Sequence, residues 1–288
     1  MTNFLSLFQK IYIHPLLWVV VAIAVVTAHF IELSLLLLII FIHELGHAAA
    51  ASFFSWRVKK ISILPFGGVA EMDEHGNRPL KEEAIVTLAG PVQHLWLMAA
   101  AFVLHEFGLI QEFIFTNFIQ FNLMILLFNL LPIWPLDGGK FIFLWLSLKD
   151  SFPKAFKQTL IISILVVALF SILMLMIEPI NLNVWIVISF ILFTLRYEWK
   201  QSRYVFIRFL MERYYGKKNE FRKLKPIVVE PDELVIHVLE RFQRGYKHPI
   251  IIEKNGKETG SLDENELLHA YFAEKQITAK IGDLLYPY

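Results

Sequence analysis

The sequence predicts a polytopic α-helical membrane protein with six transmembrane helices, followed by a small soluble α/β domain. Hydrophobic residues make up 56% of the chain, whereas charged residues make up only 18%. The apolar residues are clustered in blocks long enough to cross a bilayer, which takes about 20 residues. From Pro226 onward the composition changes to that of a soluble protein. These three observations together define the fold class.

Six apolar segments are expected to span the membrane. The first is interpreted as a retained span, because it is too long for a signal peptide and no small-residue cleavage site follows it. We expect a membrane domain over residues 1–199, a basic linker over 200–225 and a soluble domain over 226–288. The predicted spans are residues 13–31, 33–54, 84–105, 113–134, 158–177 and 183–199.

Charged residues in the loops predict the orientation. Lys and Arg residues follow the second, fourth and sixth spans. The connections after the first, third and fifth spans, on the opposite side of the membrane, lack them. Those opposite connections contain Glu32, Glu106, Glu112 and Glu178. Because positively charged loops stay on the cytoplasmic side, we expect both termini to be cytoplasmic.

The second span contains two histidines and a glutamate in the order His43-Glu44-Leu45-Gly46-His47. Residues four apart on a helix project from one face, so both imidazoles can reach one Zn²⁺. Glu44 projects about 100° away, where it can take a proton from an attacking water. The alternative is that these three polar residues only form hydrogen bonds with one another in a buried helix. Ionisable groups inside a bilayer are costly, which favours the functional interpretation.

A second candidate ligand follows the fourth span. The segment reads Asn129-Leu-Leu-Pro132-Ile-Trp-Pro135-Leu-Asp137-Gly138-Gly139, and its prolines predict a carboxylate on unwound backbone. The chain has no cysteine, so any zinc must be held by nitrogen and oxygen. Asp137 would complete a set of two nitrogens and one carboxylate, leaving a fourth position for water. An isolated Asp-Gly is usually only a turn.

The segment from Ile61 to Met72 is too short to cross the membrane and partly alternates like a strand. Pro65 with Gly67 and Gly68 predicts a sharp reversal. We interpret it as a re-entrant hairpin near the metal site, whose free edge can pair with an extended substrate. An ordinary cytoplasmic turn is the alternative.

These motifs resemble the site-2 protease family of intramembrane zinc metalloproteases. The resemblance covers about residues 10–200 and implies a core of three helices. It implies that one zinc ion is bound by His43, His47 and Asp137, with Glu44 as general base. Members of this family also suggest that Asn129 contacts the substrate backbone near the scissile bond. We further expect Gly67 and Gly68 of the hairpin, and Pro135, to take part in substrate binding.

One departure from the family pattern lies at Ala89-Gly90-Pro91-Val92-Gln93-His94. Many members have Asn at the last position. We interpret His94 as a hydrogen-bonded interior histidine, the alternative being that it orients another polar group.

Residues 197–225 alternate basic and aromatic side chains directly after the sixth span. This pattern predicts a helix on the anionic cytoplasmic face of the membrane. A nucleic-acid patch is disfavoured beside a membrane, so no nucleic acid is expected as a partner.

The soluble domain alternates strand and helix patterns. Strands are expected at 227–229 and 249–253, a turn at Asn255-Gly256, and helices at 233–242 and 265–272. The unit resembles a single CBS module, which normally works in pairs, so self-association is expected. In that pattern a Thr hydroxyl and an Asp carboxylate bind the ribose and phosphate of ATP. Asp263 and Glu266 stand at the aligned positions, and the carboxylate of Asp263 in place of Thr would repel phosphate. A plain dimerisation or docking module is the alternative.

The overall layout resembles sporulation members of the same protease family. That resemblance implies a membrane-tethered pro-sigma factor as substrate, small membrane proteins as inhibitors, and a bacterial inner membrane, such as that around the forespore. Two other classes remain open. One is a membrane transporter regulated by its CBS-like module, and the other is a membrane scaffold that has lost catalysis.

Overall fold

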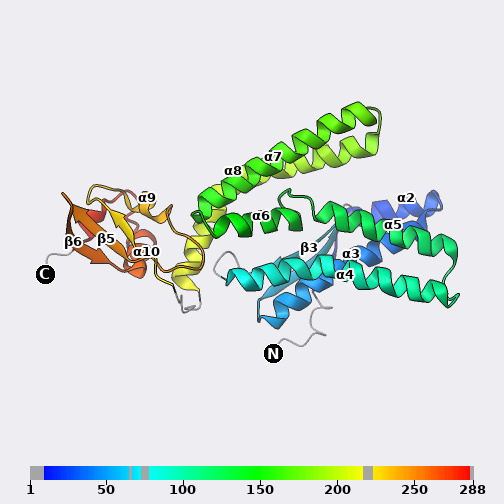
Figure 1. The fold of residues 1–288 in the computed structure, drawn as a ribbon, viewed down its shortest axis with the longest axis horizontal. Helices are drawn as coiled ribbons and strands as arrows, with labels where there is room; N and C mark the ends of the chain where they lie inside the picture. The colour runs from blue at the N-terminus through cyan, green and yellow to red at the C-terminus, as the bar shows by residue number, and fades with distance from the viewer. Residues whose placement is uncertain (1–9, 65–66, 73–77, 217–222, 286–288) are drawn as a thin grey trace. The chain divides into compact units, whose positions relative to one another are not determined.

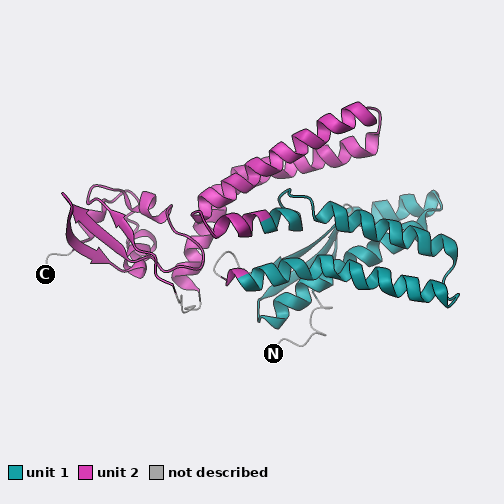
Figure 2. Ribbon diagram, in the orientation of Figure 1, with its two compact units in different colours: residues 1–74, 81–141 teal, residues 75–80, 142–288 magenta. Residues whose placement is uncertain are grey.

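The computed structural model describes residues 10–64, 67–72, 78–216 and 223–285. The chain forms two compact units, which Figure 2 shows in different colours. Unit 1 comprises Met1–Glu74 and Lys81–Phe141, and unit 2 comprises His75–Leu80 and Ile142–Tyr288.

Unit 1 contains a small sheet and several long apolar helices (Figure 1). Pro15 begins the first helix, where its missing N–H costs nothing, and the His14 side chain caps that helix. The last helix, α6, begins in this unit. The elements are β1 (Ile11–Ile13), α2 (Pro15–Val26), α3 (Phe30–Phe53), β2 (Val58–Leu64), β3 (Gly67–Met72), α4 (Leu80–Glu106), α5 (Glu112–Asn129) and α6 (Asp137–Ser147).

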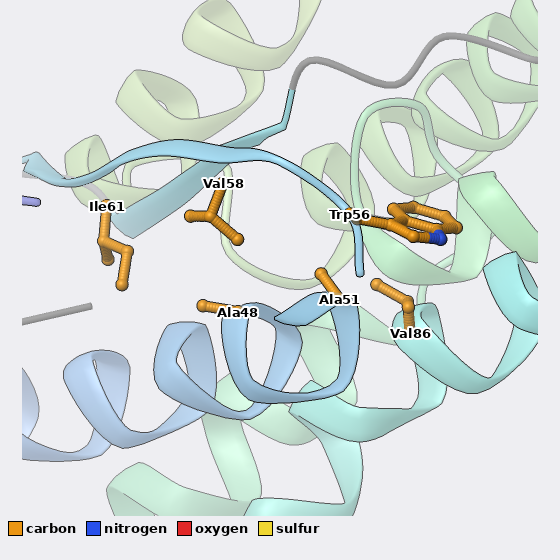
Figure 3. Close-up of a cluster of buried hydrophobic side chains, with 6 residues drawn as sticks. All are labelled: Ala48, Ala51, Trp56, Val58, Ile61 and Val86. Carbon is orange, nitrogen blue, oxygen red and sulfur yellow. The ribbon is translucent and has the colours of Figure 1, made fainter. Parts of the chain in front are cut away.

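The sheet of unit 1 has the order β1-β2-β3. β1 pairs with β2 in parallel, and β2 pairs with β3 antiparallel. β2 packs on α3, where small alanine side chains allow a close approach (Figure 3). The buried cluster comprises Ala48, Ala51, Trp56, Val58, Ile61 and Val86. β3 therefore forms an edge of this sheet, beside the helix that carries the histidine pair.

Five of the described helices are long and apolar enough to cross a membrane, namely α3, α4, α5, α7 and α8. The first predicted span forms the shorter helix α2 of 12 residues. At 1.5 Å per residue, α2 is about 18 Å long, less than the roughly 30 Å of a hydrocarbon core. Large apolar side chains outside the core, such as Val26 at 86% and Ile180 at 92% exposed, are consistent with a lipid surrounding. The number of spans stays a prediction.

Unit 2 starts with the end of α6 and a pair of long helices, α7 (Phe152–Ile177) and α8 (Leu182–Tyr215). α8 is one continuous helix of 34 residues, so the start of the expected linker extends the sixth span. Phe206, Phe209 and Leu210 of this extension are buried inside unit 2, and Phe209 stacks on Phe152. Part of the face that we expected to meet lipid headgroups is therefore covered by protein, whereas Tyr204 stays exposed.

The C-terminal part of unit 2 confirms the expected strand positions. Its sheet has the order β4-β5-β6, with β4 parallel and β6 antiparallel to β5. Asn255 and Gly256 make the turn between β5 and β6 with positive φ angles of 53° and 73°. The elements are β4 (Ile227–Val229), α9 (Val235–Leu239), β5 (Ile250–Lys254), β6 (Lys257–Leu262), α10 (Glu264–Phe272) and the 3₁₀ helix η1 (Ile281–Leu284).

The two carboxylates at the nucleotide-aligned positions cap a helix. The Asp263 carboxylate accepts a hydrogen bond from the backbone N–H of Asn265. The Glu266 carboxylate accepts one from the backbone N–H of Asp263. Lys247 also pairs with Asp263 at 2.6 Å. Both acidic side chains therefore help to start α10. Resemblance to a CBS module, self-association and ATP binding stay predictions.

Candidate metal centre

Two imidazoles of α3 project toward one point, as their spacing predicts. His43 and His47 are both buried, and their rings meet edge to face with centroids 4.7 Å apart. Their Nε2 atoms lie 3.1 Å apart. One turn of an α-helix thus provides two nitrogen ligands on the same face.

Asp137 provides the third candidate ligand from a distant part of the chain. α5 ends at Asn129, and α6 begins with Asp137 after a short connection of turns. The expectation of a carboxylate on unwound backbone is therefore wrong, because Asp137 is the first residue of a helix. Gly138 makes this turn possible, since a Cβ there would lie 2.3 Å from the carbonyl oxygen of Leu130.

The three side chains fit a single tetrahedral ion. Asp137 Oδ2 lies 3.1 Å from His47 Nε2 and 3.3 Å from His43 Nε2. Metal–ligand bonds of 2.0–2.1 Å at tetrahedral angles place neighbouring ligand atoms about 3.3–3.4 Å apart. The observed separations match this edge length, so the two nitrogens and one oxygen can hold one zinc ion. Three protein ligands leave the fourth position for water or substrate.

The second polar atom of each ligand has a partner of its own. His47 Nδ1 lies 2.8 Å from the carbonyl oxygen of Val86, and His43 Nδ1 lies 3.0 Å from His94 Nε2. Lys140 donates from Nζ to Asp137 Oδ1 at 3.0 Å. These contacts leave the remaining ligand atoms directed at one another.

The sequence interpretation missed Lys140 as part of the site. Its position three residues after Asp137 could have indicated this role, because residues at this spacing are neighbours on a helix. Val86 contacts His47 through its backbone carbonyl, and a backbone contact cannot be recognised from the residue type.

Gly90 of α4 makes room for both imidazoles. A Cβ at this position would lie 2.2 Å from His47 Nε2 and 2.8 Å from His43 Cε1. No side chain can occupy that space without moving the rings. The adjacent Pro91 lies inside α4.

Glu44 lies between the ligand helix and the edge strand of the sheet. It is buried, and β3 contacts it at Gly68, where an added Cβ would be 2.3 Å from Glu44 Cγ. The predicted hairpin near the metal site is thus present as β2 and β3. Pro65, which we expected to start the reversal, lies outside the described residues.

The other residues assigned to substrate binding lie near the ends of these elements. Asn129 is the last residue of α5, and its amide donates to the Ile125 carbonyl at 3.1 Å. Pro135 is exposed and lies two residues before Asp137. Gly67 has a φ of +148° and open space around its Cβ position. Their roles in substrate binding stay predictions.

Known proteins are similar to this chain in sequence and in fold. Residues 31–113 and 103–173 match the model of Peptidase family M50. The chain is 49% identical over 288 residues to Stage IV sporulation protein FB of Bacillus subtilis (strain 168), covering 100% of both chains. The chain belongs to Peptidase family M50. This membership confirms the resemblance to the site-2 proteases, and it makes the chain a metalloprotease of an integral membrane type.

A sequence match and a solved structure from Methanocaldococcus jannaschii extend the comparison. Zinc metalloprotease MJ0392 of Methanocaldococcus jannaschii is 27% identical over 234 residues, which are 79% of this chain and 65% of the relative. The solved structure of the Site-2 Protease from Methanocaldococcus jannaschii superimposes with a TM-score of 0.53 and 27% identity. That match covers 65% of this chain and 89% of the solved one.

Proposed function

We propose that this chain is a zinc-dependent intramembrane endopeptidase that cleaves a membrane-associated protein. One observation carries the proposal. His43 and His47 from one apolar helix meet Asp137 from a segment 90 positions away, at ligand separations suited to one ion. Buried ionisable groups in an apolar helix are otherwise costly, so their convergence favours a chemical role.

The chemistry follows from the donor set and from Glu44. A zinc ion in a site with an open position polarises a carbonyl and lowers the pKa of water. Glu44 is next to His43 in sequence and is buried at the same site, so we assign it as the general base. It takes a proton from the attacking water and then returns that proton to the leaving amine.

The edge strand β3 is the proposed binding surface for the substrate backbone. A peptide in a helix has its carbonyl groups engaged, so it must be extended before it is attacked. An edge strand offers main-chain hydrogen bonds to such an extended segment. β3 contacts Glu44 at Gly68, which would bring a paired peptide close to the general base. Asn129 and Pro135 are proposed to hold the peptide near the scissile bond.

The proposed substrate is a membrane-tethered pro-sigma factor. The sequence identity of 49% to a stage IV sporulation protein favours a role in sporulation. We also propose six spans with both termini cytoplasmic, based on the loop charges. The C-terminal part is proposed to be a CBS-like module that self-associates. Small membrane proteins that inhibit cleavage belong to the same proposal.

Substitution of Glu44 tests the proposal directly. Glu44→Gln should abolish cleavage of a co-expressed membrane-tethered pro-sigma factor while the purified variant keeps the zinc content of the wild type. Glu106→Gln, at the end of α4, is the matched control and should cleave normally. Continued cleavage by the Glu44 variant would contradict the proposed mechanism. A transporter would not need this carboxylate, and a scaffold would show no cleavage even as wild type.

Zinc analysis tests the ligand set separately. His43→Ala and Asp137→Ala should each lower the zinc content of the purified protein. Full stoichiometry in either variant would remove that residue from the ligand set.

A further inference from the structure

A series of buried polar side chains runs outward from His43 through α4 to α5. His43 Nδ1 lies 3.0 Å from His94 Nε2, and His94 Nδ1 lies 3.1 Å from Asn122 Oδ1. His94 and Asn122 have no exposed surface. The proposed chemistry uses neither residue, yet burying polar groups is costly unless they are paired.

The direction of each hydrogen bond follows from the far end of this series. Asn122 Nδ2 donates to the Phe118 carbonyl at 2.9 Å, so its Oδ1 is the atom that faces His94. An amide oxygen only accepts, so His94 Nδ1 carries the hydrogen. A neutral imidazole has one N–H, which leaves His94 Nε2 as an acceptor. His43 must then donate from Nδ1, and its Nε2 keeps the lone pair.

That lone pair lies where a metal ligand is needed. His43 Nε2 faces both His47 Nε2 and Asp137 Oδ2, at 3.1 Å and 3.3 Å. With the other tautomer, an N–H would point at the same place and no nitrogen of His43 could bind zinc there. The tautomer and the ring orientation of His43 are both set by the two residues behind it.

We infer that His94 and Asn122 are positioning residues that fix His43 as an Nε2 zinc ligand. Asn122 orients His94, and His94 accepts the hydrogen bond that orients His43. This role corresponds to the alternative interpretation of His94 in the sequence analysis, that it orients another polar group. The inference rests on the proposed zinc site and adds the residues that prepare one of its ligands.

The second histidine ligand provides an internal contrast. His47 Nδ1 faces the Val86 carbonyl, which can only accept, so the backbone fixes that tautomer. Side-chain substitutions at positions 94 and 122 therefore act on His43 alone. Outer partners of metal-bound histidines commonly change metal affinity by about 10- to 100-fold when they are removed.

Two apolar variants and two conservative variants test the inference on the full-length purified protein. His94→Leu and Asn122→Leu remove the hydrogen bonds while an apolar side chain still fills each position. His94→Gln keeps an acceptor for His43, and Asn122→Asp keeps an acceptor for His94. His105→Leu on α4 and Asn117→Leu on α5 are matched controls. Asn117 donates to the Phe113 carbonyl just as Asn122 donates to Phe118, but it lies away from the metal site.

Zinc affinity is measured by competition with a chelator, and the ligand field is read from the visible spectrum of the Co²⁺-substituted protein. The two Leu variants should bind zinc about 10- to 100-fold more weakly and should show an altered Co²⁺ spectrum. The Gln and Asp variants should recover most of the affinity. Both controls should match the wild type.

The outcomes separate this inference from the proposed function. Wild-type affinity and an unchanged Co²⁺ spectrum in the Leu variants would overturn the positioning role. Equal losses in the Leu variants and in their Gln and Asp counterparts would also overturn it, because they would indicate a packing effect. A wild-type protein that binds no zinc would instead overturn the proposed function.

Discussion

Gly68 of β3 lies directly against the side chain of Glu44. A Cβ added at Gly68 would be 2.3 Å from Glu44 Cγ and 2.9 Å from Glu44 Oε1. The edge strand and the proposed general base are thus in contact with no space for an intervening methyl group. The position of the carboxylate depends on the absence of a side chain at residue 68.

Gly68→Ala should therefore lower the cleavage rate without removing zinc. The methyl group forces Glu44 or β3 to move, and a displacement of about 1 Å in a catalytic group can cost roughly 100-fold in rate. Cleavage of the membrane-tethered substrate and zinc content should be measured together. Ile13→Ala, at an exposed position on β1 of the same sheet, is the control. A Gly68→Ala variant with the wild-type rate would separate β3 from catalysis.

The sequence predicted those parts of the site that depend on local spacing. His43 and His47 are four residues apart on one helix, so their convergence needs no knowledge of the tertiary fold. Asp137 was predicted as a ligand because its motif is specific. Its position at the start of α6 was not predicted. Two prolines and two glycines indicated a broken helix, whereas close packing of Gly138 on the Leu130 carbonyl allows a new one.

Tertiary contacts explain what the sequence did not predict. The series from His43 to Asn122 joins three helices, and no periodicity within one segment indicates it. The basic and aromatic residues after the sixth span were expected to face lipid headgroups. In the structure Arg213 binds Glu264, which is 51 positions away, and the neighbouring Phe209 is buried. Burial of that face depends on contacts with Phe152, which lies earlier in the chain, and with Glu264, which lies later.

Gly90→Ala should reduce zinc binding. The new methyl group would lie 2.2 Å from His47 Nε2 and 2.8 Å from His43 Cε1, so at least one imidazole must rotate away from the ligand geometry. Zinc content after dialysis and the chelator competition constant are the measurements. Val92→Ala, at an exposed position on the same helix, should leave both unchanged. Normal zinc binding by Gly90→Ala would show that the ligands tolerate this displacement.

Lys140→Met should weaken zinc binding by about 10- to 100-fold, the range seen when an outer partner of a ligand is lost. Lys140 holds Asp137 Oδ1 at 3.0 Å and so directs Oδ2 at the two imidazoles. Lys140→Arg keeps the charge and should retain more of the affinity. Titration of zinc-free protein with a competing chelator measures the difference. Equal affinities in the Met variant and the wild type would contradict this role.

Arg213→Met should destabilise the C-terminal part of unit 2. The Arg213 guanidinium makes two hydrogen bonds to Glu264, at 2.6 and 2.8 Å, and also binds the carbonyl groups of Gln243 and Tyr246. Removing one partner of a buried ion pair costs about 3–5 kcal/mol, because the other charge is left unpaired. Hydrogen exchange of the β4-β5-β6 sheet in the intact protein measures the loss.

The matched control for Arg213→Met is Arg203→Met at an exposed position on the same helix, where we expect little change in protection of the sheet. The double variant Arg213→Met with Glu264→Met should be less destabilised than the two single variants predict by addition, because no unpaired charge remains. Additive effects would show that the two side chains act independently.

Acidification should destabilise the same region through His248. Burial, the largest effect, lowers the pKa of His248, and the nearby Arg213 charge acts in the same direction. The neutral ring accepts from the Gln243 amide at Nε2 and lies 2.8 Å from the Lys225 carbonyl at Nδ1. Protonation of Nε2 would remove the first of these hydrogen bonds.

Because the pKa of His248 is lower in the folded protein, its contribution to stability is complete above the unfolded value near 6.5. As the pH falls below that value, the unfolded chain binds a proton first, so stability decreases by up to about 1.4 kcal/mol per pH unit. Hydrogen exchange of the β4-β5-β6 sheet between pH 7.5 and about 5 measures this slope. His248→Gln should flatten it, whereas His237→Gln, at an exposed position, should not. Parallel slopes in His248→Gln and wild type would assign the acid sensitivity to other groups.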